Sequence, residues 1–173
     1  TVSSKYLFRR PWLTVRCEDM LLPNGNHIPE YYILEYPDWV NTIAITKEGK
    51  FVFVRQYRPG IQRTCYELCA GVCEAEDASP LVSAQRELWE ETGYGKGNWQ
   101  EYMVVSANPS THTNLTHCFL ATDVELIDHQ HLEDTEDLSV HLLTLEEVRS
   151  LLENNEIMQS LNAAPLWKYM AGL

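Results

Sequence analysis

The stretch QRELWEETGYG (residues 85–95) decides how the whole chain is interpreted. It places three carboxylates, those of Glu87, Glu90 and Glu91, within five positions and then reaches Gly93. On a helix, like charges four residues apart repel by only about 0.2–0.5 kcal/mol per pair, so a solvated acidic face would tolerate them. The spacing by itself therefore leaves the role of the three glutamates open.

The residues around this stretch predict one helix, and its apolar face shows where the glutamates lie. Ser79 is a typical N-cap, Pro80 suits the first turn and Gly93 supplies a left-handed stop. A mostly apolar stripe that would face the core is formed by Leu81, Ala84, Gln85, Leu88 and Thr92. Glu87 and Glu91 fall side by side at the edge of this stripe.

At the edge of the core, the negative charges of the two glutamates need to be compensated. Desolvation makes unpaired like charges costly, and a divalent cation between Glu87 and Glu91 would remove that cost. Oxygen ligands without a histidine nearby in sequence favour Mg²⁺ or Mn²⁺ over zinc. Glu90 lies further round the helix, four residues after Arg86, with which it can pair. From the residues alone, a metal site and an exposed acidic face both remain open.

Length, composition and charge narrow the class of protein. With 173 residues and a hydrophobic fraction of 45%, the chain is expected to form one globular domain with at most a small appendage. A net charge of −12 disfavours nucleic acid as a partner. We expect neither a membrane span nor a secretory signal, because long apolar runs are absent and the start, TVSSKYLFRRPWL, lacks the secretory pattern.

The five cysteines are odd in number and unevenly spaced, which favours free thiols in a reducing cytoplasm over a disulfide framework. Cys65, Cys69 and Cys73 recur every fourth residue, whereas zinc sites usually combine tighter pairs with a second pair elsewhere. We therefore expect a cytoplasmic protein in which these cysteines hold no metal.

The rest of the chain reads as strands with a few helices. Strands are expected at 12–22, 30–36, 40–58 (a hairpin turning at Gly49), 65–71, 101–107, 116–122 and 138–144. Thr144 and Glu147 form a capping box before helical stretches at 145–153 and 156–171. This order predicts an α/β or α+β sandwich, with a small β-unit at 1–37 and the main domain at 38–173.

The segment AGVCEAEDASPLVSAQRELWEETGY (70–94) resembles the Nudix box, a signature built around R-E-hydrophobic-x-E-E-x-G-hydrophobic. Its second half, from Arg86 to Tyr94, matches at every fixed position. The first half departs, because Gly71 stands one residue early and the nearest acid is Asp77; a one-residue insertion in the following loop accounts for both shifts. The departure leaves the structural role of that first acid open. The resemblance implies an α/β/α sandwich around a mixed β-sheet.

The resemblance covers residues 38–150. Within the family, this segment most resembles the ADP-ribose and ADP-sugar pyrophosphatases. The segment VRQYRPGIQRTCYELCAG (54–71) resembles strands that line the substrate cleft in that subgroup, with Cys69 in place of the usual proline. Pro109 falls where the subgroup carries a proline, and residues 133–143 resemble its acidic loop and last strand. The N-terminal β-unit resembles the small domain with which these enzymes dimerise.

The resemblance implies a metal site and a catalytic set. Glu87 and Glu91 would ligate Mg²⁺, with the Ala70 carbonyl as a further ligand, and Glu136 could complete the site.

The catalytic set implied by the resemblance is acidic. Glu136 and Asp134 compete for the role of general base toward the attacking water, and the sequence does not rank them. Glu90 would be either a further metal ligand or a group held by Arg86. Without the Nudix resemblance, the acidic loop would be interpreted as a solvated turn.

Substrate contacts are expected from Trp39, Arg55, Arg58, Glu67 and, by resemblance, Pro109. Guanidinium groups suit phosphate oxygens, but Arg55 and Arg58 are three apart on a strand and point to opposite faces. One would contact phosphate, while the other pairs with a carboxylate such as Glu67 or reaches across a dimer. Trp39 would either stack on a purine or pack beside its strand.

We therefore expect a Mg²⁺-dependent hydrolase that splits the pyrophosphate of a nucleoside diphosphate sugar, such as ADP-ribose, into AMP and a sugar phosphate, and that acts as a homodimer. A Nudix hydrolase for another substrate, such as GDP-mannose or a dinucleotide, is one alternative. A catalytically silent module that binds a nucleotide sugar is the other. The intact glutamates argue against silence, and the displaced first half of the box argues for it.

Overall fold

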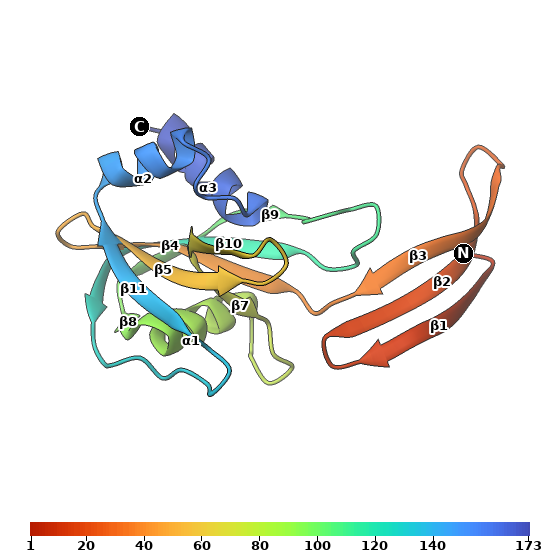
Figure 1. Cartoon of the computed structure of the whole chain (residues 1–173), viewed down its shortest axis with the longest axis horizontal. Helices are drawn as coiled ribbons and strands as arrows, with labels where there is room; N and C mark the ends of the chain where they lie inside the picture. Colours follow the sequence, from red (N-terminus) through yellow and green to blue (C-terminus); the bar gives the residue numbers. More distant parts are fainter.

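The computed structural model describes residues 1–173 and divides their strands between two sheets (Figure 1). The smaller sheet is an antiparallel meander of β1 (Ser3–Arg10), β2 (Leu13–Leu21) and β3 (His27–Glu35). Figure 1 shows this sheet projecting away from the rest of the molecule. Its second turn contains Gly25 at a φ of 85°, a left-handed conformation that suits glycine.

The larger sheet has eight strands and carries the core. They are β4 (Trp39–Thr46), β5 (Phe51–Arg58), β6 (Arg63–Glu67), β7 (Cys69–Val72), β8 (Tyr94–Gly95), β9 (Asn98–Val105), β10 (Thr116–Leu126) and β11 (Leu138–Leu143). The main path runs β11-β5-β4-β10-β8, with β6 on β5, β7 on β4 and β9 on β10. Only β4 and β10 pair in parallel, so the sheet is mixed. Strand β4 is buried almost throughout, as expected of a central strand covered on both faces.

Helices cover both faces of this sheet (Figure 1). Helix α1 (Pro80–Thr92) lies on one face, and α2 (Leu145–Glu153) and α3 (Ser160–Ala171) lie on the other. This arrangement confirms the predicted α/β/α sandwich around a mixed sheet. None of the three helices combines the length and the apolar character that a membrane crossing requires.

The local signals for helix ends act as predicted. The Ser79 hydroxyl accepts a hydrogen bond from the Val82 N–H, and Gly93 ends α1 at a φ of 75°. Thr144 and Glu147 form the expected reciprocal capping box at the start of α2. These signals depend on neighbouring residues alone, which is why the sequence reveals them.

One strand prediction is wrong, and one predicted hairpin is confirmed over a shorter stretch than expected; both differences matter for the site. The strand expected at 65–71 is broken at Leu68, whose side chain turns into the core with 1% exposure. The hairpin expected at 40–58 has the predicted turn, but β4 and β5 pair only at Ala44–Val52 and Ile45–Phe51. Beyond that point β7 takes the place of β5 beside β4. The two halves of the broken strand therefore separate, and a cavity opens between β5 and β7.

One further strand and one helix boundary differ from the sequence-based expectation. The sequence does not predict strand β1, because the stretch SSKYLFRR lacks an apolar alternation; the strand is exposed along its length. Helix α3 begins at Ser160 rather than at residue 156. Asn155 adopts a left-handed φ of 56° after α2, and the following Ile157 is buried, so the chain turns before the last helix begins.

Replacement of Gly93 by alanine should destabilise the protein strongly. A Cβ at this position would lie 2.2 Å from the carbonyl oxygen of Asp128, in addition to the unfavourable left-handed φ. We expect the free energy of unfolding to fall by about 2–5 kcal/mol, measured by urea denaturation. Gly49→Ala is the matched control, because Gly49 has the same φ of 75° with open space around it. An equal loss in both variants would contradict the close approach of the 128 loop to α1.

Candidate active site

The three glutamates of α1 line a cavity of about 270 Å³ between this helix, β7 and the loop before β11. The cavity is lined by Trp12, Ala70, Gly71, Val72, Glu74, Arg86, Glu87, Glu90, Glu91, His131, Glu133 and Glu136. Six of these residues are glutamates, and Arg86 is the only lysine or arginine among them. The cluster is thus a concave set of oxygen donors rather than a solvated helix face. We call it the carboxylate cavity.

Strand β7 holds two of the carboxylates at close range. The Ala70 N–H donates a hydrogen bond to Glu91 Oε2 at 3.1 Å. A Cβ built on Gly71 would lie 2.0 Å from the Glu87 carboxyl carbon, so only glycine admits that side chain. Gly71, the glycine that stands one residue early in the motif, therefore allows the Glu87 side chain to approach β7.

Burial changes the proton affinity of this pair. Glu91 is 5% exposed, and desolvation raises its pKa to about 8. Burial also raises the pKa of Glu87, against the opposing effect of the neighbouring Arg86. The position at the core boundary expected from the helical stripe is confirmed. In the absence of a cation, the pair is stabilised by holding a proton.

Arg86 organises the carboxylates without being free for a substrate. Its Nη1 donates to Glu87 and Glu90 at 3.0 and 2.9 Å, and its Nη2 donates to the Val72 carbonyl at 3.0 Å. Burial acts against the charged guanidinium, but Asp77, Glu87 and Glu90 together raise the pKa of Arg86. The predicted pairing of Arg86 with Glu90 is confirmed, and the geometry makes Arg86 a positioning residue.

Asp77 resolves the question left by the irregular first half of the motif. Its carboxylate accepts from Arg86 Nη2 at 3.0 Å, and this hydrogen bond lowers the pKa of Asp77. Asp77 Oδ2 also accepts from the Glu74 N–H at 3.3 Å, which closes the loop before α1. The inserted residue therefore leaves an acid in position to tie that loop to Arg86.

The acidic loop brings to the cavity one of the two residues that the sequence singled out. Glu136 lines the cavity, and its carboxylate accepts from the Glu133 N–H at 2.9 Å. Asp134 does not line the cavity, whereas Glu133 does. Sequence reasoning also missed Trp12 from the β1–β2 turn, because nothing local indicates that this turn reaches α1.

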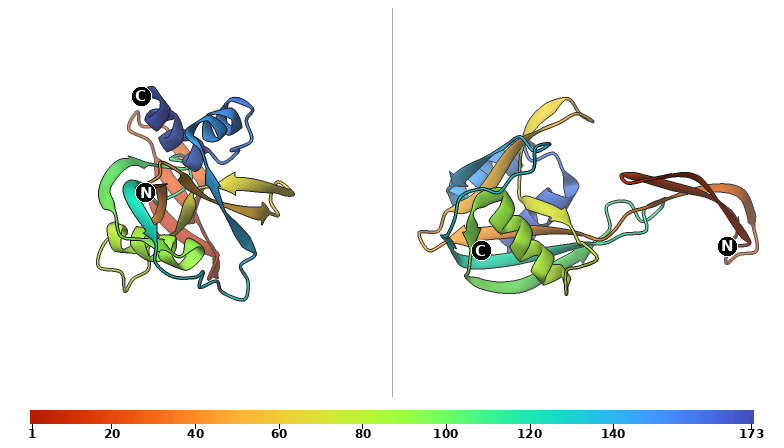
Figure 2. Two further views of the ribbon diagram at one scale, coloured as in Figure 1. Left: turned by 90° about the vertical axis from the view of Figure 1, so that its left-hand side faces the viewer. Right: turned by 90° about the horizontal axis from the view of Figure 1, so that it is seen from below.

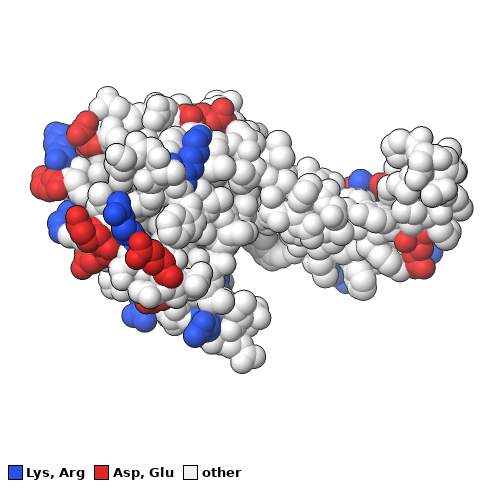
Figure 3. Space-filling model, turned by 90° about the horizontal axis from the view of Figure 1, so that it is seen from above, with Lys and Arg blue, Asp and Glu red and all other residues white.

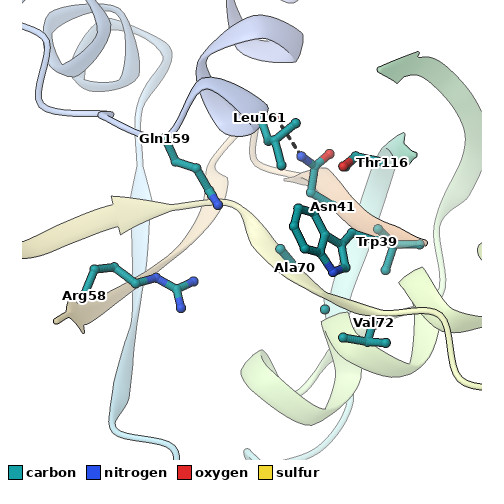
Figure 4. Close-up of a pocket in the computed structure, with 10 residues that line it drawn as sticks. Trp39, Asn41, Arg58, Ala70, Val72, Thr116, Gln159 and Leu161 are labelled. Atoms are coloured by element: carbon teal, nitrogen blue, oxygen red, sulfur yellow. Dashed lines mark hydrogen bonds between the residues drawn. The ribbon is translucent and has the colours of Figure 1, made fainter. Parts of the chain in front are cut away.

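A second cavity, of about 250 Å³, adjoins the first where β5 and β7 separate (Figure 4). Both cavities share Ala70, Gly71 and Val72 of β7. The other residues that line this second cavity are Trp39, Val40, Asn41, Arg58, Thr116, Gln159 and Leu161. Figure 4 shows Arg58 and Gln159 across the cavity from Trp39. We call it the Trp39 cavity.

Unpaired polar atoms line the Trp39 cavity. The Asn41 side-chain N–H donates to the Leu161 carbonyl at 2.7 Å, but Asn41 Oδ1 has no hydrogen-bond partner. Thr116 Oγ1 is also unpaired, and both residues are only 2% exposed. Buried polar atoms are normally hydrogen-bonded, so these two are suited to contact a polar ligand. Trp39 itself also packs against Tyr36 and His112.

The remaining predicted substrate residues differ in their placement. Arg58 forms a two-pronged ion pair with buried Glu67, through contacts of 2.8 and 2.5 Å, and still lines the Trp39 cavity. Arg55 is exposed, lies over the Tyr66 ring and lines neither cavity. Pro109 belongs to the loop between β9 and β10, which hydrogen-bonds to Leu34 and which Figure 2 shows beside β3. It also lines neither cavity.

The relationship to known proteins agrees with this geometry. Residues 36–163 match the family model for the NUDIX domain. The chain belongs to the Nudix family. Residues 1–34 match the model for the nucleoside diphosphate sugar hydrolase N-terminal domain.

Two similar proteins align with more than nine tenths of this chain. An ADP-ribose pyrophosphatase of Bacillus subtilis (strain 168) is 30% identical over 94% of this chain and 88% of its own length. A methanol dehydrogenase activator of Bacillus methanolicus is 29% identical over 92% and 86%. The expectation of a Nudix pyrophosphohydrolase is confirmed by these matches.

A solved structure supports the fold. The crystal structure of an ADP compounds hydrolase superposes with a TM-score of 0.84 at 21% identity and covers 99% of this chain and 93% of its own. At that identity the likeness concerns the Nudix fold alone, and it includes the projecting N-terminal sheet.

The raised pKa of Glu91 predicts a pH dependence of stability in the metal-free protein. Between pH 4.5 and about 8 the folded state keeps a proton that the unfolded state releases, so this residue makes stability fall as pH rises. In chelator, Glu91→Gln should become progressively more stable than the natural protein from pH 5 to pH 8, as measured by urea denaturation. Glu146→Gln on exposed α2 is the control and should show no such trend. A constant difference for Glu91→Gln would contradict the burial of this carboxyl group.

The close contact at Gly71 predicts a specific defect. Gly71→Ala should displace the Glu87 carboxylate and lower kcat/KM for nucleotide-sugar hydrolysis by about 10²-fold, because catalytic groups tolerate little misplacement. Gly172→Ala is the control, since a Cβ there meets only ordinary contacts. Unchanged kcat/KM in Gly71→Ala, with the fold retained by circular dichroism, would show that Glu87 need not approach β7.

Proposed function

We propose that this protein hydrolyses the pyrophosphate bond of ADP-ribose or a closely related ADP-sugar, giving AMP and a sugar phosphate, with the help of Mg²⁺. The observation that carries the proposal is the pair of adjoining cavities that share β7. One is lined by carboxylates, and the other contains an aromatic ring, an arginine and unpaired polar atoms. The relative named ADP-ribose pyrophosphatase supports the choice of substrate.

The residues of the carboxylate cavity fit a hard divalent cation. Their donors are carboxylate oxygens, which Mg²⁺ and Mn²⁺ prefer, and two of them are buried together at a cost that a cation removes. Glu87 and Glu91 would hold the cation, with Glu90, Glu136 and the Ala70 carbonyl as further ligands. When bound, such a cation neutralises charge on the diphosphate and lowers the pKa of a coordinated water.

The chain's own side chains would then orient the substrate. Glu67 binds Arg58 through Nε and Nη2 and so fixes the guanidinium group. Nη1 of Arg58 would then be available to donate to a phosphate oxygen. Trp39 would stack on a flat ring, and Asn41 Oδ1 would accept a hydrogen bond from the nucleoside or sugar. Glu136, which lines the carboxylate cavity, would accept the proton of the attacking water. We favour it over Asp134, which does not line the cavity.

Two other functions remain to be separated from this one. A Nudix hydrolase for GDP-mannose or a dinucleotide would use the same carboxylates with a different pocket. A silent nucleotide-sugar-binding module would keep the Trp39 cavity and lose turnover. A regulatory role is a real alternative, because one similar protein is named an activator of another enzyme. The complete carboxylate set and the intact contacts of Arg86 favour catalysis.

Release of AMP from ADP-ribose tests the proposal. With Mg²⁺ the natural protein should release AMP, and Glu91→Gln should lower kcat by about 10²-fold or more, because a cation ligand is lost. Glu146→Gln should retain full activity. A panel of ADP-ribose, GDP-mannose and a dinucleotide, compared by kcat/KM, ranks the substrates. Preserved binding with no turnover of any of them would establish the silent module instead.

We also propose that the N-terminal sheet joins two copies of the chain. Its large apolar side chains are unusually exposed: Val2 is 67%, Phe8 57%, Trp12 81% and Leu21 59% exposed. On the face drawn in Figure 3, uncharged side chains cover the middle of this sheet and charged ones lie along its edges. Where such apolar side chains form a contiguous patch, they typically mark a protein interface, and we propose that they do so here. The five free cysteines fit the proposed location in a reducing cytoplasm.

Light scattering after size exclusion tests the homodimer. We expect twice the 20.0 kDa mass of one chain, and Phe8→Asp should shift the population toward the single-chain mass. Leu142→Asp is the control, because Leu142 is 46% exposed on β11 of the other sheet. A single-chain mass for the natural protein at micromolar concentration would exclude the dimer.

A further inference from the structure

A second group of metal-ligating side chains lies in the segment after β10. Asp128, His129 and His131 each offer one ligand atom, and these atoms lie within 4.8 Å of one another. Asp128 Oδ1 lies 2.7 Å from His129 Nδ1, and Asp128 Oδ2 lies 3.0 Å from His131 Nε2. A tetrahedral ion with ligands at about 2.0–2.1 Å keeps them about 3.3 Å apart. Small side-chain rotations would therefore suffice for the three groups to enclose one ion.

The backbone that carries these side chains is fixed to the end of α1. Four donors bind the last carbonyls of that helix: Ile127 N–H and Asp128 N–H to Gly93 at 2.9 and 3.1 Å, His131 N–H to Glu90 at 2.8 Å, and the Gln130 side chain to Glu91 at 2.8 Å. These carbonyls have no partner within the helix, so the segment takes the place of water there. The backbone positions of the three ligands are thus tied to the end of α1 by hydrogen bonds.

The imidazole of His131 is fixed as well. Its ring stacks on Trp89, with centroids 4.1 Å apart and planes at 28°. The His129 ring lies 4.3 Å from the His131 ring and is otherwise open to solvent, since 79% of its side chain is exposed. One ligand is therefore held in place, and its partner can close over an arriving ion.

We propose that Asp128, His129 and His131 form a second cation site, suited to zinc and similar transition metals rather than to Mg²⁺. Two imidazole nitrogens and one carboxylate match the donor preference of Zn²⁺, whereas Mg²⁺ prefers oxygen ligands only. Three protein ligands leave one position for water or a small anion. His131 also lines the carboxylate cavity, so the two sites adjoin while differing in ligand chemistry.

The histidine resonances of the protein offer a direct test, because the chain has only six histidines. Zn²⁺ is titrated, in saturating Mg²⁺, into protein freed of any purification tag, while the imidazole Cε1–Hε1 signals are followed by NMR. We expect the signals of His129 and His131 to shift together and to saturate at one equivalent. His27 is the internal control, because it forms an exposed ion pair with Asp19 but has no second imidazole beside it.

Variants make the test decisive. His129→Ala should weaken Zn²⁺ binding by at least about tenfold, since one of three ligands is lost, and should not disturb the fold because the side chain is exposed. His27→Ala should leave the affinity unchanged. Equal shifts at all exposed histidines, or an affinity that His129→Ala does not alter, would overturn the proposal.

Discussion

The burial of two like-charged carboxylates against one short strand is the constraint on which this structure depends. The Glu87 and Glu91 side chains lie on the face of α1 that is turned toward β7. Glu87 contacts Gly71, and Glu91 accepts a hydrogen bond from the Ala70 N–H. Such a pair is stable only when a proton or a cation compensates its charge. The pKa of Glu91 is raised for this reason, because burial favours the protonated form. Arg86 balances the outer side of the cluster and leaves its inner side to the cavity.

The fold provides for this constraint through a change of partner within the central sheet. Strand β4 begins beside β7 and ends beside β5, and the broken strand at Leu68 makes the change possible. The same separation opens the Trp39 cavity next to the carboxylates. A site for a charged group and a site for a flat, polar group thus share one strand, which is the arrangement that a nucleotide sugar requires.

The features that the sequence revealed are those determined by near neighbours. Ser79, Gly93 and the pair Thr144–Glu147 fixed the helix ends, and the helical spacing placed Glu87 and Glu91 at the core boundary. The break at Leu68 was invisible, because it depends on which strand lies alongside. Trp12 and Glu133 reach the cavity from segments distant in sequence, and Glu74 reaches it through the loop before α1; only the folded chain brings them together. The same holds for Asp77, whose contact with Arg86 no spacing rule could supply.

Cation binding by the carboxylate cavity is best measured directly, without turnover. Mn²⁺ binding can be followed by electron paramagnetic resonance in a His129→Ala background, so that the histidine segment does not contribute. We predict one or more Mn²⁺ ions bound by this protein, displaced by Mg²⁺, and a loss of affinity of about 10²-fold or more when Glu87 and Glu91 are both changed to glutamine. Undiminished Mn²⁺ binding in that variant would contradict the central role given to the buried carboxylates.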